Sequence, residues 1–261
     1  MSYSTLRYDL TGSVATIALD RQDRMNALSL PLLTELAQAL DAAVAEGARA
    51  LILTGEGKAF CSGADLIGED GQIGLPEDLG ALLESHYEPV VQRLADLPIP
   101  IVTAMNGPAV GAGLSIALAG DIVIAARSAY LLLAFVNIGL VPDAGATWLV
   151  AKSVGRAKAL EMALLGERLS ADDALAAGLI TRVVEDGEGL TEARKTAERL
   201  AAMPTRAIGM IRRQVASALS ATLTETLDIE RENQRAAGRT GDFAEGVQAF
   251  IDKRKPNFQG K

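Results

Sequence analysis

The sequence predicts an α/β fold followed by a helical C-terminal region. Up to about residue 185, short apolar runs that suit buried strands alternate with longer segments whose apolar residues recur at helical spacing. This alternation resembles repeated units of two strands and a helix. From residue 191 to 251 only the helical spacing remains, with breaks near Pro204 and residues 238–241. We therefore divide the chain into a core at residues 1–200 and a helical region at residues 201–261.

The expected strands are short runs rich in β-branched and aliphatic residues. They cover residues 5–10, 14–19, 50–53, 101–105, 122–126, 130–135 and 180–184. The first two runs are expected to form a hairpin that turns at residues 11–13. The run at 50–53 is apolar at every position, which is typical of a strand in a sheet covered on both faces.

The expected helices begin at capping residues or follow loops of small residues. Ser29 suits the N-cap of a helix that begins at Leu30 and ends near Gly47. Further helices are expected at residues 82–97, at residues 114–119, after Asp143, and after Ser170, which opens a motif of capping-box form. Residues 67–80 are rich in glycine and acidic residues and are expected to form a mobile loop.

Composition limits the kinds of function that the chain can have. Its 261 residues are 49% hydrophobic and 22% charged, as in ordinary globular proteins. A net charge of −8 without a basic patch argues against nucleic acid as a partner. No apolar run approaches the ~20 residues of a membrane span, and no signal peptide is visible, so a cytoplasmic protein is expected. With one cysteine and one histidine, metal sites and histidine-based triads are not expected.

Three loops of small residues each join an expected strand to an expected helix, around Ala64, Ala112 and Asp143. In the first two, the backbone N–H groups can bind an oxygen that becomes negatively charged. The third offers a carboxylate. Two such donors and a proton-transferring acid are what an enolate-stabilising enzyme needs. Two simpler interpretations stay open: the glycines only permit close packing, and Asp143 only caps a helix.

Other interpretations of these loops fit less well. The spacing Gly107-x-x-x-Gly111-x-Gly113 lacks the G-x-G-x-x-G pattern of dinucleotide-binding proteins. Cys61 has no histidine near it in sequence, so we interpret it as a small buried residue. Tyr87 and Trp148 are expected to belong to the core or to line a pocket.

Five motifs stand in an order that points to one protein family. They are LDR at 19–21 with MNAL at 25–28, AFCSGADL at 59–66, NG at 106–107 leading to Gly113, GLVPD at 139–143, and GDFAEG at 241–246 leading to Phe250. Over residues 6–258 the chain resembles the enoyl-CoA hydratase/isomerase (crotonase) family. The resemblance implies a crotonase-like spiral of ββα units, with a helical C-terminal region that forms a homotrimer or a dimer of trimers.

The resemblance also implies a substrate and a set of site residues. The N–H groups of Ala64 and Ala112 would form an oxyanion hole for the thioester oxygen of an acyl-CoA substrate. Coenzyme A would arrive as part of that substrate, with no separate cofactor. The remaining substrate-binding and CoA-binding positions that it implies are Arg24, Ala27, Ser62, Asp65, Leu66, Gly111, Phe135, Phe250 and Lys253. The last two match tail positions that often reach a CoA bound to a neighbouring subunit, although Arg24 and Lys253 can equally be solvated charges.

The chain departs from typical hydratases of this family at two positions. Those enzymes use two glutamates to activate water, and the matching positions here are Ser115 and Phe135. Asp143 then becomes the expected proton shuttle, and burial near Phe135, Val136 and Trp148 is expected to raise its pKa.

These features are most like the family's isomerases, which convert ring-1,2-epoxyphenylacetyl-CoA or shift 3-enoyl-CoA to 2-enoyl-CoA. The alternatives are a hydratase with an atypical active site, a non-catalytic acyl-CoA-binding scaffold, and a thioester hydrolase or aromatic dehalogenase.

Overall fold

The computed structural model describes residues 3–67, 72 and 74–261, and its main sheet has the strand order β1-β2-β3-β4-β6-β9. These strands are β1 (Leu6–Thr11), β2 (Val14–Leu19), β3 (Ala50–Gly55), β4 (Ile101–Met105), β6 (Ile122–Ala126) and β9 (Arg182–Val184). β1 and β2 pair antiparallel, and every later pair in this sheet is parallel. A smaller sheet has the order β5-β7-β8, from β5 (Ala109–Val110), β7 (Tyr130–Leu132) and β8 (Leu169–Ser170).

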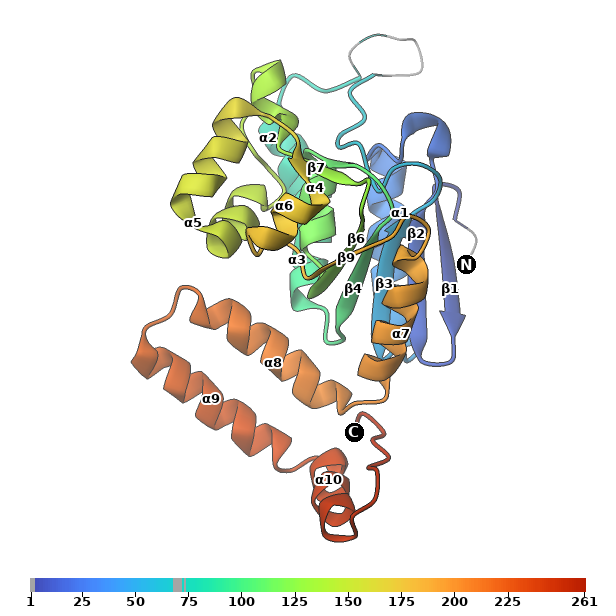
Figure 1. The fold of residues 1–261 in the computed structure, drawn as a ribbon, viewed down its shortest axis with the longest axis vertical. Coiled ribbons are helices and arrows are strands. Elements are labelled where there is room, and N and C mark those ends of the chain that lie inside the picture. Colours follow the sequence, from blue (N-terminus) through green and yellow to red (C-terminus); the bar gives the residue numbers. More distant parts are fainter. Residues whose placement is uncertain (1–2, 68–71, 73) are drawn as a thin grey trace.

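Helices cover the main sheet and extend beyond it (Figure 1). The α-helices are α1 (Leu30–Ala45), α2 (Leu79–Leu82), α3 (Glu88–Asp96), α4 (Ala112–Leu118), α5 (Ala146–Leu165), α6 (Ala171–Ala176), α7 (Gly189–Ala201), α8 (Thr205–Ala218), α9 (Leu223–Ala237) and α10 (Gly241–Ile251). Three shorter segments are the 3₁₀ turns η1 (Gln22–Arg24) and η3 (Ala134–Ile138) and the π-helical turn η2 (Leu83–Tyr87). None of the helices in the described part of the chain has both the length and the apolarity of a membrane span.

Strand β3 shows how the sheet is buried on both faces. Leu51 and Leu53 lie in the larger apolar cluster, together with residues of α1, α3 and α4. Ala50 and Ile52 point the other way, because side chains alternate along a strand, and they lie in the cluster that α7 completes. The prediction of a strand covered on both faces is confirmed.

Most predicted elements are confirmed, with differences at their ends. Ser29 caps α1, since its side chain accepts a hydrogen bond from the N–H of Leu32 at 3.3 Å. The helix expected at 82–97 begins earlier, at Leu79, and contains the π-helical turn η2. The strand expected at 130–135 stops at Leu132, and the chain then turns into η3. The predicted mobile loop falls partly on residues 68–71 and 73, which lie outside the described residues.

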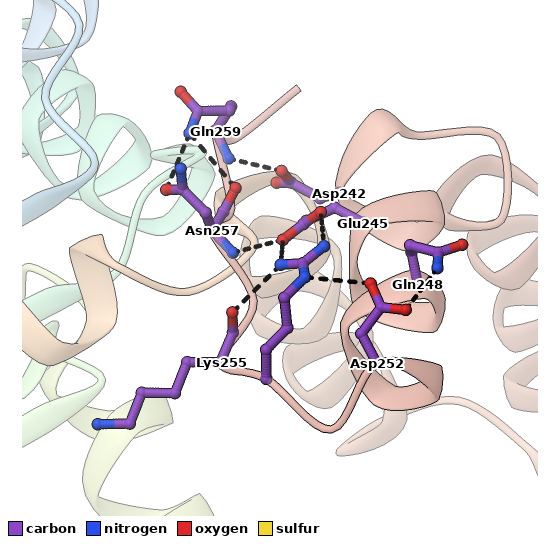
Figure 2. Close-up of polar contacts among 8 residues, drawn as sticks. Asp242, Glu245, Gln248, Asp252, Lys255, Asn257 and Gln259 are labelled. Carbon is purple, nitrogen blue, oxygen red and sulfur yellow. Dashed lines mark hydrogen bonds and ion pairs between the residues drawn. The ribbon is translucent and has the colours of Figure 1, made fainter.

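Helices α8, α9 and α10 lie away from the main sheet, and the chain after α10 folds back along α10 (Figures 1 and 2). The buried carboxylate of Asp242 accepts hydrogen bonds from two backbone N–H groups of this tail, at 2.6 and 2.8 Å. Arg254 donates to Glu245 at 2.6 Å and lowers the pKa of that carboxyl to about 2. Arg49 donates to the carbonyl oxygen of Phe258 at 2.8 Å. These contacts fix the end of the chain against α10 and against the start of β3.

Candidate active site

Two of the three small-residue loops lie side by side and are hydrogen-bonded to each other. Cys61 and Ala109 form a parallel bridge, and the N–H of Val110 donates to the carbonyl oxygen of Cys61 at 2.9 Å. Ala64 and Ala112 each lie three residues beyond this bridge. One short pairing therefore aligns the two loops that carry the predicted amide donors.

Glycines allow these loops to approach each other closely. A Cβ atom at Gly113 would lie 2.6 Å from the Sγ atom of Cys61, closer than real atoms come. Gly63 has a φ of +96°, and Gly111 has a φ of +54°, which L side chains rarely adopt. The glycines therefore do permit close packing, as one interpretation of the sequence held, and this packing brings the two backbone segments together.

The N–H groups of Ala64 and Ala112 donate no hydrogen bond to any part of the chain that the structure describes. Ala112 is the first residue of α4, so its amide has no intrahelical partner. Both residues line one cavity of about 750 Å³. Two unpaired amides in the wall of one cavity can together stabilise a negatively charged oxygen if both point to it.

The wall of this cavity is largely apolar. Leucine, valine, isoleucine and alanine side chains from the loop after β3, from α2, η2, α3 and η3, and from the loop before α5 supply most of it. Among the described residues that line it, two bear carboxyl groups, Asp143 and Glu88. Glu88 is exposed to solvent, whereas Asp143 is only partly exposed.

The side chain of Asp143 is not used as a helix cap. The N-cap of α5 is Gly145, and no side chain bonds to that helix end. The Oδ1 atom of Asp143 is buried and has no hydrogen-bond partner within the described chain, and burial raises the pKa of this carboxyl to about 6. The hydroxyl of Ser115 donates to the backbone carbonyl oxygen of Asp143 at 3.2 Å, which holds the loop in place. The helix-capping interpretation is therefore wrong.

The source of this burial differs in part from the prediction. Phe135 is 6% exposed and lines the cavity, as expected. Val136 and Trp148 are 40% and 45% exposed and do not line it, so the expectation that they bury Asp143 is wrong. Other apolar residues line the cavity around Asp143 instead, among them Val91 on α3 and Leu140 in the loop after η3.

The sequence and the fold match one family of proteins. The family model described as enoyl-CoA hydratase/isomerase matches residues 9–261. The chain belongs to the enoyl-CoA hydratase/isomerase family. It is 45% identical to the 1,2-epoxyphenylacetyl-CoA isomerase of Escherichia coli K12, over 95% of each chain. It is 44% identical to a protein of Rhodobacter capsulatus named probable enoyl-CoA hydratase, over the full length of both. The crystal structure of enoyl-CoA hydratase from Bacillus anthracis superposes with a TM-score of 0.92, at 33% identity, over 99% of this chain and all of that one.

The structure brings together part of the expected set of site residues for this family. The cavity is lined by Ala64, Ala112, Asp143, Ser62, Leu66, Gly111 and Phe135. Tyr87, expected in the core or in a pocket wall, is buried and lines the cavity as well.

The other expected residues lie outside the cavity of this single chain. They are Arg24, Ala27, Asp65, Phe250 and Lys253. The carboxylate of Asp65 is paired with Arg21 at 2.7 Å, so it is a structural ion pair between two loops. Phe250 is 85% exposed at the end of α10, at the far end of the molecule from α2 and α4 (Figure 1). CoA binding by these five residues stays a prediction, and Phe250 and Lys253 are expected to reach the CoA of a neighbouring subunit rather than this cavity.

Sequence reasoning missed Glu88 and Gln92, which also line the cavity. Their helix follows a glycine-rich loop whose path the sequence does not specify. The sequence near Glu88 and Gln92 therefore did not indicate that this helix lines the same cavity as Asp143. Cys61 is buried as expected, and burial raises the pKa of its thiol to about 12, which keeps it protonated and unreactive.

The raised pKa of Asp143 predicts that Asp143→Asn stabilises the fold. The native carboxyl binds its proton up to about pH 6, whereas an unfolded aspartate loses it near 3.8. Wild-type stability therefore falls as pH rises from about 4 to 6, and the variant avoids this loss. Solvent screens part of the effect, so we expect a gain of about 1 kcal/mol above pH 6, or about 2–4 °C in Tm. Thermal unfolding at pH 4 and pH 7.5 measures it; a gain of equal size at both pH values would contradict the raised pKa.

Proposed function

We propose that this protein is an acyl-CoA isomerase. The thioester enolate is held by the N–H groups of Ala64 and Ala112, and the carboxyl group of Asp143 moves a proton between carbon atoms of the acyl group. One observation carries the proposal: a buried, unpaired carboxyl oxygen belongs to the same apolar cavity as two unpaired backbone amides. Coenzyme A enters as part of the substrate, and the proposed reaction uses no separate cofactor.

The pKa of Asp143 suits a group that must both take and return a proton. With a pKa of about 6, it is mostly ionised at neutral pH and can accept a proton from the carbon next to the thioester. The charge that this leaves on the thioester oxygen is stabilised by the two amides. The protonated Asp143 then returns the proton to a carbon further along the chain, which moves the double bond and restores the carboxylate.

Two substrate classes fit this chemistry, 3-enoyl-CoA esters and the ring epoxide of phenylacetyl-CoA. The 45% identical relative from Escherichia coli is named for the second class. Both classes need one oxyanion hole and one proton shuttle. The positions of the two hydratase glutamates support this choice, because Ser115 lies outside the cavity wall and Phe135 carries no acid.

Hydration is the second candidate function, and a specific observation favours it. Glu88 gives the cavity wall a second carboxyl group, which could activate water together with Asp143. The 44% identical relative from Rhodobacter capsulatus is named as a probable hydratase. Glu88 is solvent-exposed, which leaves it less suited to hold a water molecule in a fixed place.

Assays of wild type and Glu88→Gln on three CoA esters separate these functions. We expect wild type to convert 3-hexenoyl-CoA and the ring epoxide, and Glu88→Gln to retain these rates within about twofold. Formation of 3-hydroxyacyl-CoA from crotonyl-CoA at a higher rate than isomerisation, and its loss in Glu88→Gln, would favour the hydratase. Binding of acyl-CoA without turnover of any of the three esters would favour a non-catalytic scaffold.

We also propose that the protein self-associates through its C-terminal helices, as a homotrimer or a dimer of trimers. Large apolar side chains are exposed along one face of α10, at Phe243, Val247, Phe250 and Ile251. Large apolar side chains are exposed on α8 and α9 as well, at Ile211, Val215, Leu223 and Leu227, and exposed apolar residues in such number are typical of an interaction surface. A neighbour seated there would bring Phe250 and Lys253 towards another subunit's CoA.

This assembly predicts that Phe250→Asp produces smaller particles, because it places a charge on the apolar surface. Light scattering coupled to size-exclusion chromatography measures the mass. Gln38→Asp, which adds the same charge at an exposed position of α1, is the control and should keep the wild-type mass. A monomeric wild type would contradict the proposal.

A further inference from the structure

Tyr87 is a buried tyrosine in the cavity wall whose hydroxyl has no partner. The residue is 4% exposed and lines the cavity, and its hydroxyl makes no hydrogen bond within the described chain. The hydroxyl oxygen is not itself fully buried, so it is open to the cavity and can donate to a molecule bound there. Tyr87 ends the π-helical turn η2, and such turns are frequent at functional sites.

The chemistry of this hydroxyl makes it a hydrogen-bond donor. Burial and the nearby charge of Asp143 both raise the pKa of Tyr87, so its proton stays in place at any physiological pH. No hydrogen bond joins Tyr87 to Asp143. The cavity therefore contains a hydrogen-bond donor, the Tyr87 hydroxyl, and a proton acceptor, the Asp143 carboxyl group, that do not bond to each other.

The other donor-bearing side chains among the described lining residues each already donate one hydrogen bond within the chain. Ser62 donates to the carbonyl oxygen of Arg24 at 3.3 Å, Gln92 to Asp96 at 2.8 Å, and Asn137 to the carbonyl oxygen of Gly166 at 3.0 Å. The two free amides are reserved for the thioester oxygen in the proposed function. Among these described side chains, Tyr87 has the one that donates no hydrogen bond, so it is the best placed to serve a second oxygen atom of a substrate.

We propose that Tyr87 determines specificity by donating a hydrogen bond to an oxygen atom carried on the acyl group itself. The substrate class is then a CoA thioester whose acyl group bears an epoxide, ether or hydroxyl oxygen, in preference to a plain hydrocarbon chain. This inference rests on the proposed function, because it assigns the thioester oxygen to Ala64 and Ala112. Of the two substrate classes that one oxyanion hole and one carboxylate would serve, the inference selects the oxygenated one, the ring epoxide, over plain 3-enoyl-CoA esters.

A binding experiment tests the inference without requiring turnover. Calorimetry compares phenylacetyl-CoA with 2-hydroxyphenylacetyl-CoA on wild type, Tyr87→Phe and Tyr8→Phe. A neutral hydrogen bond corresponds to about a 3–10-fold preference, which wild type should show for the hydroxylated ester. Tyr87→Phe should bind both esters equally, with phenylacetyl-CoA affinity unchanged within about twofold. Tyr8→Phe removes a hydroxyl that bonds to Glu46 just after α1, outside the cavity, and should keep the wild-type preference.

Kinetics supply the second test. Tyr87→Phe should lower kcat/KM for the ring epoxide of phenylacetyl-CoA about 3–10-fold and leave that for 3-hexenoyl-CoA within about twofold. An equal loss on both esters, or a shift of both pH profiles, would show that Tyr87 acts through Asp143 or the fold, and would overturn the inference. If neither ester reacts, the isomerase proposal fails, but the binding experiment still decides the role of Tyr87. Equal Kd values of wild type for phenylacetyl-CoA and 2-hydroxyphenylacetyl-CoA would overturn the inference about Tyr87.

Discussion

Replacing Asp143 by asparagine is expected to lower kcat for isomerisation by about 10²–10⁴-fold, the usual contribution of a positioned acid or base. The amide has nearly the same shape but cannot accept the proton. Because the two amides of the proposed oxyanion hole are untouched, we expect the Kd of acyl-CoA to change little. Stopped-flow assays of 3-hexenoyl-CoA conversion, with calorimetry for binding, measure both quantities.

The pH profile of wild type belongs to the same prediction. In the proposed mechanism the ionised form of Asp143 is the active one, so kcat/KM should fall about tenfold per pH unit below pH 6 and level off above it. Asp41→Asn, at an exposed carboxylate on α1 that pairs with Arg93 at 3.1 Å, serves as the matched control and should keep wild-type rates. Asp143→Asn with wild-type activity would rule out Asp143 as the shuttle.

Gly113→Ala is expected to cost about 10²–10³-fold in kcat, the loss seen when one oxyanion donor is misplaced. The added methyl group would meet the side chain of Cys61 at 2.6 Å and its carbonyl oxygen at 2.7 Å, so the two loops must separate. That separation moves the amide of Ala112 relative to that of Ala64. Overpacking of this kind also destabilises the fold, typically by ~1–3 kcal/mol.

The control for this prediction is Gly189→Ala at the start of α7. A Cβ atom there meets nothing within 4 Å, so the same change in chemistry should leave both activity and Tm near their wild-type values. The Tm of Gly113→Ala shows whether its loss of activity comes from unfolding or from the displaced amide in a folded protein. If the purified variant is fully folded and equally active, the spacing of the two loops does not set the oxyanion hole.

The strands and the two small-residue loops could be predicted because each depends on local chemistry, whereas the choice of the Ala64 and Ala112 amides came from the family resemblance. The uniformly apolar run of β3 can only suit a strand covered on both faces, and α7 covers its second face. The loops at Ala64 and Ala112 were predictable because small residues between a strand and a helix serve few purposes. The two loops pair through Cys61 and Ala109 because β3 and β4 are parallel neighbours in the sheet. The alternation of strands and helices in the sequence does not show which strands are neighbours.

The remaining features depend on contacts between distant segments. Trp148 follows Asp143 closely in sequence but is exposed, because α5 turns it away from the cavity. Tyr87 and Glu88 reach the same cavity from a helix far from Asp143 in sequence. The π-helical turn at Leu83–Tyr87 could not be predicted, because the spacing of apolar residues indicates a helix but does not distinguish a π-helical turn from an α-helical one. Phe250 lies outside the cavity because it belongs to helices that extend away from the sheet (Figure 1).

The most direct test of the proposed function is to follow one substrate by proton NMR in D₂O. Wild type with 3-hexenoyl-CoA should give 2-hexenoyl-CoA, with deuterium entering only at the carbons between which the proton moves and little 3-hydroxyhexanoyl-CoA. Asp143→Asn should show neither exchange nor product on the same time scale. Rapid accumulation of 3-hydroxyhexanoyl-CoA, or exchange at the wild-type rate in Asp143→Asn, would contradict an isomerase that works through one aspartate and two backbone amides.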